Sequence, residues 1–186
     1  MIANHSSHLD ALALAAALPR PLAAKAFALA AGDTFFSTTS RAAFAAYAVN
    51  ALPVWRRRTS AADIEALRSR LVDDSAIFIL FPEGKRTRTG AMGPFKPGIA
   101  ALVAGTQIPV VPCWLQGAHA AWPPTRRLPR PGRPHLRIGA PLTFPTPAHT
   151  KSELAHIPTV CERAVHSLAP GNTPTFPDWK DGLRDG

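Results

Sequence analysis

Residues capable of proton transfer stand at the start of the 186-residue chain. His5 follows a short apolar stretch, Ile2-Ala3, and Asp10 comes five residues later, just before an Ala- and Leu-rich run that favours a helix. We expect His5 in the turn before this helix, which would fold the Asp10 carboxylate back toward the imidazole. A carboxylate on one ring nitrogen would fix the tautomer and leave the other nitrogen able to accept a proton.

Asp10 has two other interpretations. The segment Ser7–Asp10 matches a capping box, in which a hydroxyl caps the helix and a carboxyl three residues later bonds back to the cap. His5 would then be an ordinary loop residue, and the residues alone do not choose between a proton relay and a cap. His5, His8 and Asp10 could also ligate a metal, but no second cluster at ligand spacing follows. We therefore expect neither a metal nor another cofactor.

The charge of the chain indicates an anionic partner. Lys and Arg number 21 against 12 Asp and Glu, which gives a formal net charge of +9 at pH 7. The basic residues come in short groups beside expected turns, which favours a phosphorylated metabolite or an anionic membrane surface. We do not expect nucleic-acid binding, because the aromatic residues are not interleaved with the basic groups and no nucleic-acid motif is present.

The cysteines and the hydropathy pattern bear on the compartment. Cys113 and Cys161 are far apart and form no CxxC pair, which predicts free, buried thiols in a reducing compartment such as the cytosol. The Ala- and Leu-rich region Ala11–Ala31 is interrupted by two prolines and two basic residues, so we expect no bilayer span. We expect a cytoplasmic protein with peripheral contact at an anionic membrane.

Strands that alternate with helices predict a single α/β domain, with a largely parallel mixed sheet flanked by helices. We place this domain at residues 1–169 and a flexible tail at 170–186. Because Ile2-Ala3 is so short, we expect a truncated first strand and a chain that begins inside a larger domain. The expected strands are 2–3, 25–31, 49–55, 76–81, 108–115 and 135–139, and the expected helices are 9–18, 39–48, 60–71, 98–103 and 152–168. The segment 25–31 could also be helical, since it is rich in alanine.

Three chemically distinctive segments follow the ends of expected strands. They are His5, Arg56 after the extended run Val49–Trp55, and the turn Glu83–Arg88 after the apolar run Ala76–Phe81. In open α/β sheets, ligands bind beyond the carboxyl ends of the strands. We therefore expect the three segments to converge on one pocket.

The turn after the third of these strands has the composition of an anion site. Glu83 stands directly against a buried strand, where an unpaired carboxylate would be costly, so a merely solvated turn is the weaker interpretation. Gly84 permits close approach of the backbone to a ligand. Lys85 and Arg86 supply the charge to hold a phosphate.

These residues carry a family resemblance. The segment Asn4–Asp10 resembles the HxxxxD block of the glycerolipid acyltransferases, the lysophosphatidate acyltransferase family, and Phe81–Thr87 resembles their FPEG block. Between them, Asn50–Arg56 is similar to a block that ends in arginine, and Ile108–Pro112 is similar to a fourth, apolar block. The four blocks stand in family order and cover about the first two thirds of the chain. The resemblance implies a glycerol-3-phosphate acyltransferase-like fold.

The resemblance also implies a reaction. His5 would act as general base on the free hydroxyl of a lysophospholipid such as lysophosphatidate, with Asp10 orienting the imidazole. The hydroxyl would attack the thioester of an acyl-CoA or an acyl-carrier protein. The acceptor's phosphate would bind to the group formed by Arg56, Glu83, Gly84, Lys85 and Arg86.

Two departures from the family pattern stand out, and one alternative function stays open. Lys85 replaces the threonine or similar small residue usual in the FPEG block, and Trp55 stands where aspartate is frequent. The alternative to an enzyme of phospholipid synthesis is a catalytically silent module of the same fold that binds phosphate or lipid.

Overall fold

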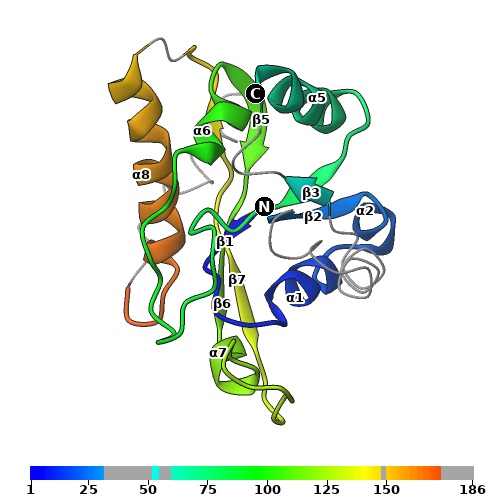
Figure 1. Ribbon diagram of the computed structural model, residues 1–186, viewed down its shortest axis with the longest axis vertical. Helices are drawn as coiled ribbons and strands as arrows, with labels where there is room; N and C mark the ends of the chain where they lie inside the picture. Colours follow the sequence, from blue (N-terminus) through cyan, green and yellow to red (C-terminus); the bar gives the residue numbers. More distant parts are fainter. Residues whose placement is uncertain (32–51, 55–59, 148–149, 173–186) are drawn as a thin grey trace, which may run out of the picture.

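Parallel strands form the centre of the molecule (Figure 1). The computed structural model describes residues 1–31, 52–54, 60–147 and 150–172. The strands are β1 (Ile2–Ala3), β2 (Ala26–Ala31), β3 (Leu52–Val54), β4 (Ile77–Ile79), β5 (Thr106–Val110), β6 (Pro112–Gln116), β7 (His135–Ile138) and β8 (Leu142–Phe144). The helices are α1 (Asp10–Ala16), α2 (Arg20–Ala23), α5 (Ala61–Val72), α6 (Gly98–Val103), α7 (Ala118–Ala121) and α8 (Lys151–Ser167).

The two larger sheets meet at β1 and β4. β2 pairs in parallel with β3 and β4, while β1 pairs in parallel with β6, which is antiparallel to β7. A parallel bridge between Ile2 and Leu80 joins the two sheets, with the Ala3 N–H donating to the Leu80 carbonyl at 3.2 Å. The strand order across this junction is therefore β3-β2-β4-β1-β6-β7. The predicted α/β fold with a largely parallel mixed sheet is confirmed, and β1 lies at its centre.

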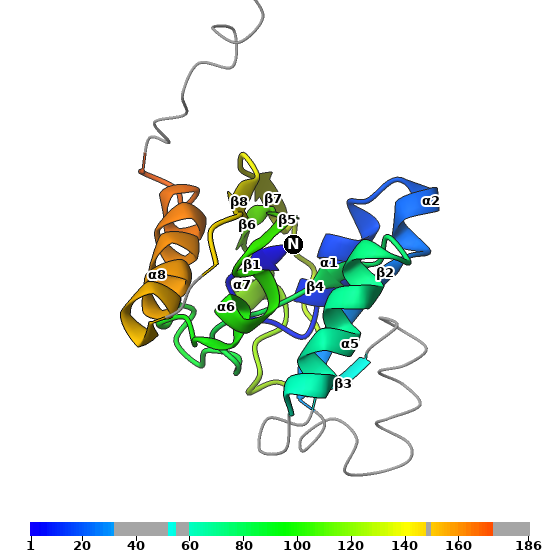
Figure 2. The ribbon, with the colours of Figure 1, turned by 90° about the horizontal axis from the view of Figure 1, so that it is seen from above.

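Side chains alternate between two apolar layers, one on each side of the strands. Ile2 faces a cluster formed with α6 and α8, whereas the next residue, Ala3, faces a cluster that includes Leu14 of α1. Figure 2 shows α8 and α1 on opposite sides of β1. Because both faces of β1 are covered, the residues that follow it are held by a rigid core.

The predicted strand 108–115 is wrong in one respect. The chain changes partners near Val111, where β5 ends its antiparallel pairing with β8 and β6 begins its pairing with β1. Pro109 lies in β5, which belongs to a two-stranded sheet with β8 and has an irregular register there, whereas β6, which contains Pro112, lies between β1 and β7. Pro112 is tolerated there because it stands at the end of the β6–β7 ladder, where its carbonyl still accepts from the Gly139 N–H at 2.8 Å.

Most of the predicted helices that can be compared are confirmed. Ser60 and Asp63 form the expected capping box at the start of α5. α1 ends at Ala16, earlier than predicted, and the short helix α2 follows it with Pro21 in its first turn. The predicted helix 39–48 lies outside the described residues. Among the described helices, none is both long enough and apolar enough to cross a bilayer.

Candidate active site

The site is built from the turn that leaves β1. Asn4, the first residue after the strand, is buried, and its side-chain amide continues the pairing with β6. It donates to the Leu115 carbonyl at 3.0 Å and accepts from the Leu115 N–H at 2.8 Å. These two bonds fix the direction in which the chain leaves the sheet and so place His5 beyond the strand end.

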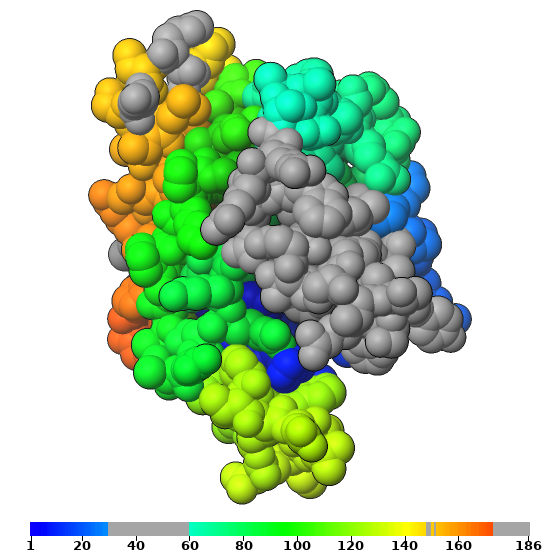
Figure 3. Space-filling view, in the orientation of Figure 1, coloured from blue at the N-terminus to red at the C-terminus, as the bar shows by residue number. Residues whose placement is uncertain are grey.

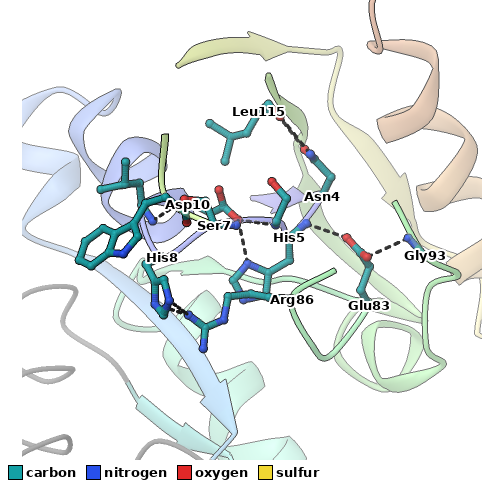
Figure 4. Close-up of polar contacts among 12 residues, drawn as sticks. Asn4, His5, Ser7, His8, Asp10, Glu83, Arg86, Gly93 and Leu115 are labelled. Atoms are coloured by element: carbon teal, nitrogen blue, oxygen red, sulfur yellow. Dashed lines mark hydrogen bonds and ion pairs between the residues drawn. The ribbon is translucent and has the colours of Figure 1, made fainter. Parts of the chain in front are cut away.

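His5 and Asp10 meet as the sequence predicted (Figure 4). The imidazole Nδ1 lies 2.9 Å from Oδ2 of Asp10, whose side chain is fully buried. The same oxygen accepts the backbone N–H of Ser6 at 2.7 Å and of Ser7 at 2.8 Å. Since the ionised carboxylate can only accept, Nδ1 carries the proton and Nε2 carries the lone pair. No described residue bonds to Nε2.

The two interpretations of Asp10 are both partly right. The carboxylate does bond back to the turn before the helix, as a capping box would require. The hydroxyl half of the box is wrong, because the N-cap residue is Leu9 and no side chain caps the helix. The Ser7 hydroxyl instead donates to the Trp122 carbonyl at 2.8 Å. One carboxylate therefore holds the backbone turn and the imidazole at the same time.

The surroundings of His5 favour its neutral form. Burial lowers the pKa of His5 below its ordinary value of 6.5, against the raising effect of the hydrogen bond and charge of Asp10, while the positive charge of Arg86 adds to the lowering. The ring stacks on Phe81, with the ring centroids 4.0 Å apart. The side chain remains 16% exposed. An unprotonated, partly accessible imidazole is what a general base needs near neutral pH.

The FPEG segment, which follows the neighbouring strand β4, and the residues just after it hydrogen-bond to both backbone groups of His5. Oε1 of Glu83 accepts the His5 N–H at 2.6 Å, and Oε2 accepts the Gly93 N–H at 2.8 Å. On the other side of the same residue, the Thr87 N–H donates to the His5 carbonyl at 2.9 Å. Burial raises the pKa of Glu83, and the two backbone donors oppose that rise. Glu83 thus positions the base and ties it to the turn after β4.

The predicted phosphate residues of this turn have different surroundings. Gly84 has a φ of +71°, a left-handed backbone conformation that disfavours any residue with a side chain, and a Cβ at this position would lie 2.7 Å from Nζ, the flexible end of Lys96. Lys85 is exposed. The guanidinium of Arg86 is half-buried and contacts the imidazole of His8, whose pKa is lowered by burial and by the charge of Arg86.

The structure brings together two of the three segments that were expected to converge. His5 and the turn 83–87 share direct hydrogen bonds at the carboxyl ends of β1 and β4. Arg56, the third predicted element, lies outside the described residues.

Several residues that build the site were not singled out for this role from the sequence. Asn4, Gly93, Thr87 and Trp122 act through backbone groups or through a side chain that bonds to backbone. Of these, only Asn4 carries a usable signal, since a polar amide directly after a strand can extend its ladder. The Trp122 carbonyl comes from a segment more than a hundred residues away, and nothing in the local sequence indicates it.

Other groups capable of chemistry have no place in this site. Cys113 and Cys161 are free and buried as predicted, and burial raises the pKa of their thiols to about 11 and about 12. Both are therefore poor nucleophiles. Within the described ranges, no three His, Cys, Asp or Glu side chains gather as a metal site.

A solved structure shares this fold. The crystal structure of the 1-acyl-sn-glycerophosphate acyltransferase PlsC from Thermotoga maritima matches with a TM-score of 0.59 and 24% sequence identity, over 90% of this chain and 64% of that one. The likeness confirms the glycerolipid acyltransferase fold that the sequence blocks implied.

Sequence relatives carry the same kind of name. A 1-acyl-sn-glycerol-3-phosphate acyltransferase of Cocos nucifera is 38% identical over 69 residues, which are 36% of this chain and 22% of the coconut protein. The human 1-acyl-sn-glycerol-3-phosphate acyltransferase alpha is 28% identical over 171 residues, 90% of this chain and 56% of the human protein. The chain thus spans between about a fifth and somewhat over half of these relatives' length.

The family model named Acyltransferase matches residues 1–116, which contain β1 with the His5–Asp10 pair and β4 with the turn 83–87. This match and the shared fold agree with the resemblance of the four sequence blocks. The chain belongs to the acyltransferase family.

Proposed function

We propose that the protein is an O-acyltransferase of phospholipid synthesis. It transfers a fatty acyl group from the thioester of an acyl-CoA or acyl-carrier protein to the free hydroxyl of a lysophospholipid such as lysophosphatidate. The observation that carries the proposal is the pairing of Nδ1 of His5 with the buried Asp10 carboxylate, beside a turn that contains Lys85 and Arg86. The names of the relatives support the choice of acceptor.

The proposed chemistry needs one base and no acyl-enzyme. Nε2 of His5 accepts the proton of the acceptor hydroxyl as its oxygen attacks the thioester carbonyl carbon. A C–O bond forms, the C–S bond breaks, and the departing thiolate takes the proton back from the imidazolium. Asp10 holds the ring in the correct tautomer and stabilises its charged form, as the carboxylate of a catalytic triad does. The proposed reaction uses no metal and no cofactor.

The acceptor's phosphate is proposed to bind beside the base. Lys85 and Arg86 supply positive charge on the turn whose Thr87 N–H donates to the His5 carbonyl, and Gly84 adds no side chain to that turn. Arg56 is the fourth member of the proposed phosphate group. Glu83, the remaining member of the predicted group, contributes by holding the turn, since both of its oxygens accept backbone N–H groups.

The test is His5→Ala in the purified protein, with thiol release from acyl-CoA measured against a panel of lysophospholipids. We expect kcat to fall by about 10²- to 10⁴-fold, the range for loss of a general base. His156→Ala, an exposed histidine on α8, is the matched control and should leave the rate unchanged.

Binding of the lysophospholipid separates the two candidate functions. Retained binding by His5→Ala together with lost transfer supports the enzyme. A wild-type protein that binds the lipid but transfers no acyl group from either donor supports the silent module instead.

A further inference from the structure

The positive charge of the chain is concentrated in one part of it. Residues 84–152 contain ten Lys and Arg and no Asp or Glu, whereas the rest of the sequence contains 11 Lys and Arg against 12 Asp and Glu. The net charge of +9 therefore comes from a single stretch. Half of its ten cations lie between residues 126 and 137, in a segment that the proposed reaction does not use.

This segment forms a projecting arm, which we define as residues 118–138: α7, the Pro- and Arg-rich loop after it, and β7. α7 and the loop form the yellow-green lobe at the lower end of the molecule in Figure 3, while β7 pairs with β6 in the sheet. Its arginines 127, 130, 133 and 137 are exposed. No carboxylate of the described residues forms a salt bridge with them. Among the described residues, the positive charge of the arm is therefore not compensated by carboxylates.

The arm also holds an apolar side chain out in the solvent. Leu128, flanked by Arg127 and Pro129, is 76% exposed, the highest value for a large apolar residue in the described part of the chain. The loop that carries it is fixed. The Arg130 N–H donates to the Ala121 carbonyl at 2.8 Å, and the Trp122 indole donates to the Arg126 carbonyl at 3.1 Å. Leu128 is therefore held away from the core by an ordered loop.

The arm is attached directly to the active site. The Trp122 carbonyl accepts the Ser7 hydroxyl at 2.8 Å and the His8 N–H at 3.2 Å. On the other side, Nε2 of His119 lies 3.1 Å from the Arg88 carbonyl, in the loop that continues from the FPEG turn. Whatever the arm binds is thereby held beside His5.

We propose that the arm docks the protein onto an anionic membrane surface, with its arginines on lipid headgroups and Leu128 in the interface. Uncompensated arginines match anionic headgroups, and an exposed leucine between them matches the boundary with the acyl chains. The docked arm would hold the His5 site at the bilayer that supplies a lysophospholipid. This last step rests on the proposed function, whereas membrane binding by the arm does not.

The test measures binding of the full chain to sedimented vesicles. We compare phosphatidylcholine alone with phosphatidylcholine mixed with phosphatidylglycerol. The arm variant is Arg127→Ala/Arg130→Ala/Arg133→Ala. The control, Arg20→Ala/Lys25→Ala/Arg163→Ala, removes the same charge from exposed positions elsewhere. We expect wild type to prefer the anionic vesicles and the arm variant to lose roughly 100-fold in partition coefficient, since each surface arginine is worth several-fold. The control should lose far less.

A second pair of variants tests the apolar contact. Leu128→Ser should weaken binding to the anionic vesicles by about ten-fold, as expected when one leucine leaves an interface. Val72→Ser, at a position 62% exposed on α5, should not weaken it. Thermal unfolding of all variants checks that each is folded.

Three results would overturn the proposal. Equal losses in the arm variant and the charge control would show that net charge alone drives binding. No preference of wild type for anionic vesicles would remove the membrane as partner. The arm would be a protein-docking surface if the arm variant still bound vesicles but lost transfer from an acyl-carrier protein in the absence of vesicles. Because vesicle binding does not require catalysis, a protein inactive in the transfer assay would still test the arm.

Discussion

The two halves of the candidate site are built in opposite ways. Around His5, the residues Asp10 and Glu83 are 0% and 5% exposed. The Asp10 carboxylate accepts the ring N–H of His5 and two backbone N–H groups of the turn after β1. The Glu83 carboxylate accepts the backbone N–H groups of His5 and Gly93. On the cationic side, Lys85 is exposed and Arg86 is half-buried. One half is fixed by buried hydrogen bonds, and the other presents charge on long side chains.

The difference matches what each half is proposed to do. Proton transfer depends on atoms held within a few tenths of an ångström, so a base gains from a rigid frame. A phosphate attracts positive charge from several directions, and flexible side chains can follow it. Substitutions in the buried half should therefore act on kcat, and substitutions in the cationic half should act on KM.

After His5→Ala, the largest effect is expected from Asp10→Asn. Asparagine keeps an oxygen that can accept the N–H groups of Ser6 and Ser7, but it removes the negative charge that orients and stabilises the imidazolium. We expect kcat to fall by about 10²- to 10³-fold, within the range for general-base catalysis, with the midpoint of thermal unfolding nearly unchanged.

Asp10→Ala, compared with Asp10→Asn, distinguishes the role of Asp10 in holding the backbone turn from its role in orienting His5. It removes the backbone bonds as well, so it should lose activity and also about 0.5–2 kcal/mol of stability, as other lost caps do. If Asp10→Asn kept its kcat within a few-fold of wild type, the carboxylate would be only a cap.

Arg86→Ala should have the next largest effect, on KM for lysophosphatidate. A charge-assisted hydrogen bond to phosphate contributes about 1.5–3 kcal/mol, which corresponds to roughly 10- to 100-fold in KM. Steady-state kinetics with acceptor concentration varied measures it, and Arg88→Ala, an exposed arginine two residues further on, is the control. A fall in kcat with KM unchanged would show that Arg86 acts in catalysis rather than in phosphate binding. It would contradict the division of the site into a buried half that sets kcat and a cationic half that sets KM.

The pH dependence tests whether the buried half holds a neutral base. The active form of His5 is unprotonated, so kcat/KM, which reports ionisations of the free enzyme, should rise about tenfold per pH unit at low pH and then level off. Because burial lowers the pKa of His5, the bend should lie below the ordinary value of 6.5. Asp10 raises this pKa, so Asp10→Asn should shift the bend to still lower pH.

His8 must be separated from this titration, since its pKa is also lowered and it contacts Arg86. The profile is therefore measured in wild type and in His8→Gln. A bend that disappears in His8→Gln would assign the ionisation to His8 and contradict the role given to His5.

Part of the candidate site could be predicted from the sequence. His5, Asp10 and the turn 83–88 could be placed together because each stands after or beside a strongly apolar run, and parallel strands end on one edge. The roles of Ser7 and Glu83 could not be predicted, because they depend on backbone groups of Trp122 and Gly93 that become neighbours only in the folded chain.

The fold shows the same limit. The capping box at Ser60 marks the start of α5 correctly, since that signal is local. The change of strand partner at Val111 was missed because the continuous apolar sequence from Ile108 to Leu115 does not say which strands lie beside it. Signals between residues close in sequence, such as a capping box, can be predicted from the chain, whereas the pairing of strands that are distant in sequence cannot.

The smallest effect is expected from Lys85→Thr, which restores the small residue usual in the family. Lys85 is exposed, so its charge acts through water and is worth at most about 1 kcal/mol, or up to roughly five-fold in KM. Screening should erase this difference as ionic strength rises, so KM is measured at low and at high salt in both proteins. A larger change that persists at high salt would mean that Lys85 makes a direct, desolvated contact with the phosphate, and the cationic half would then be built as tightly as the half around His5.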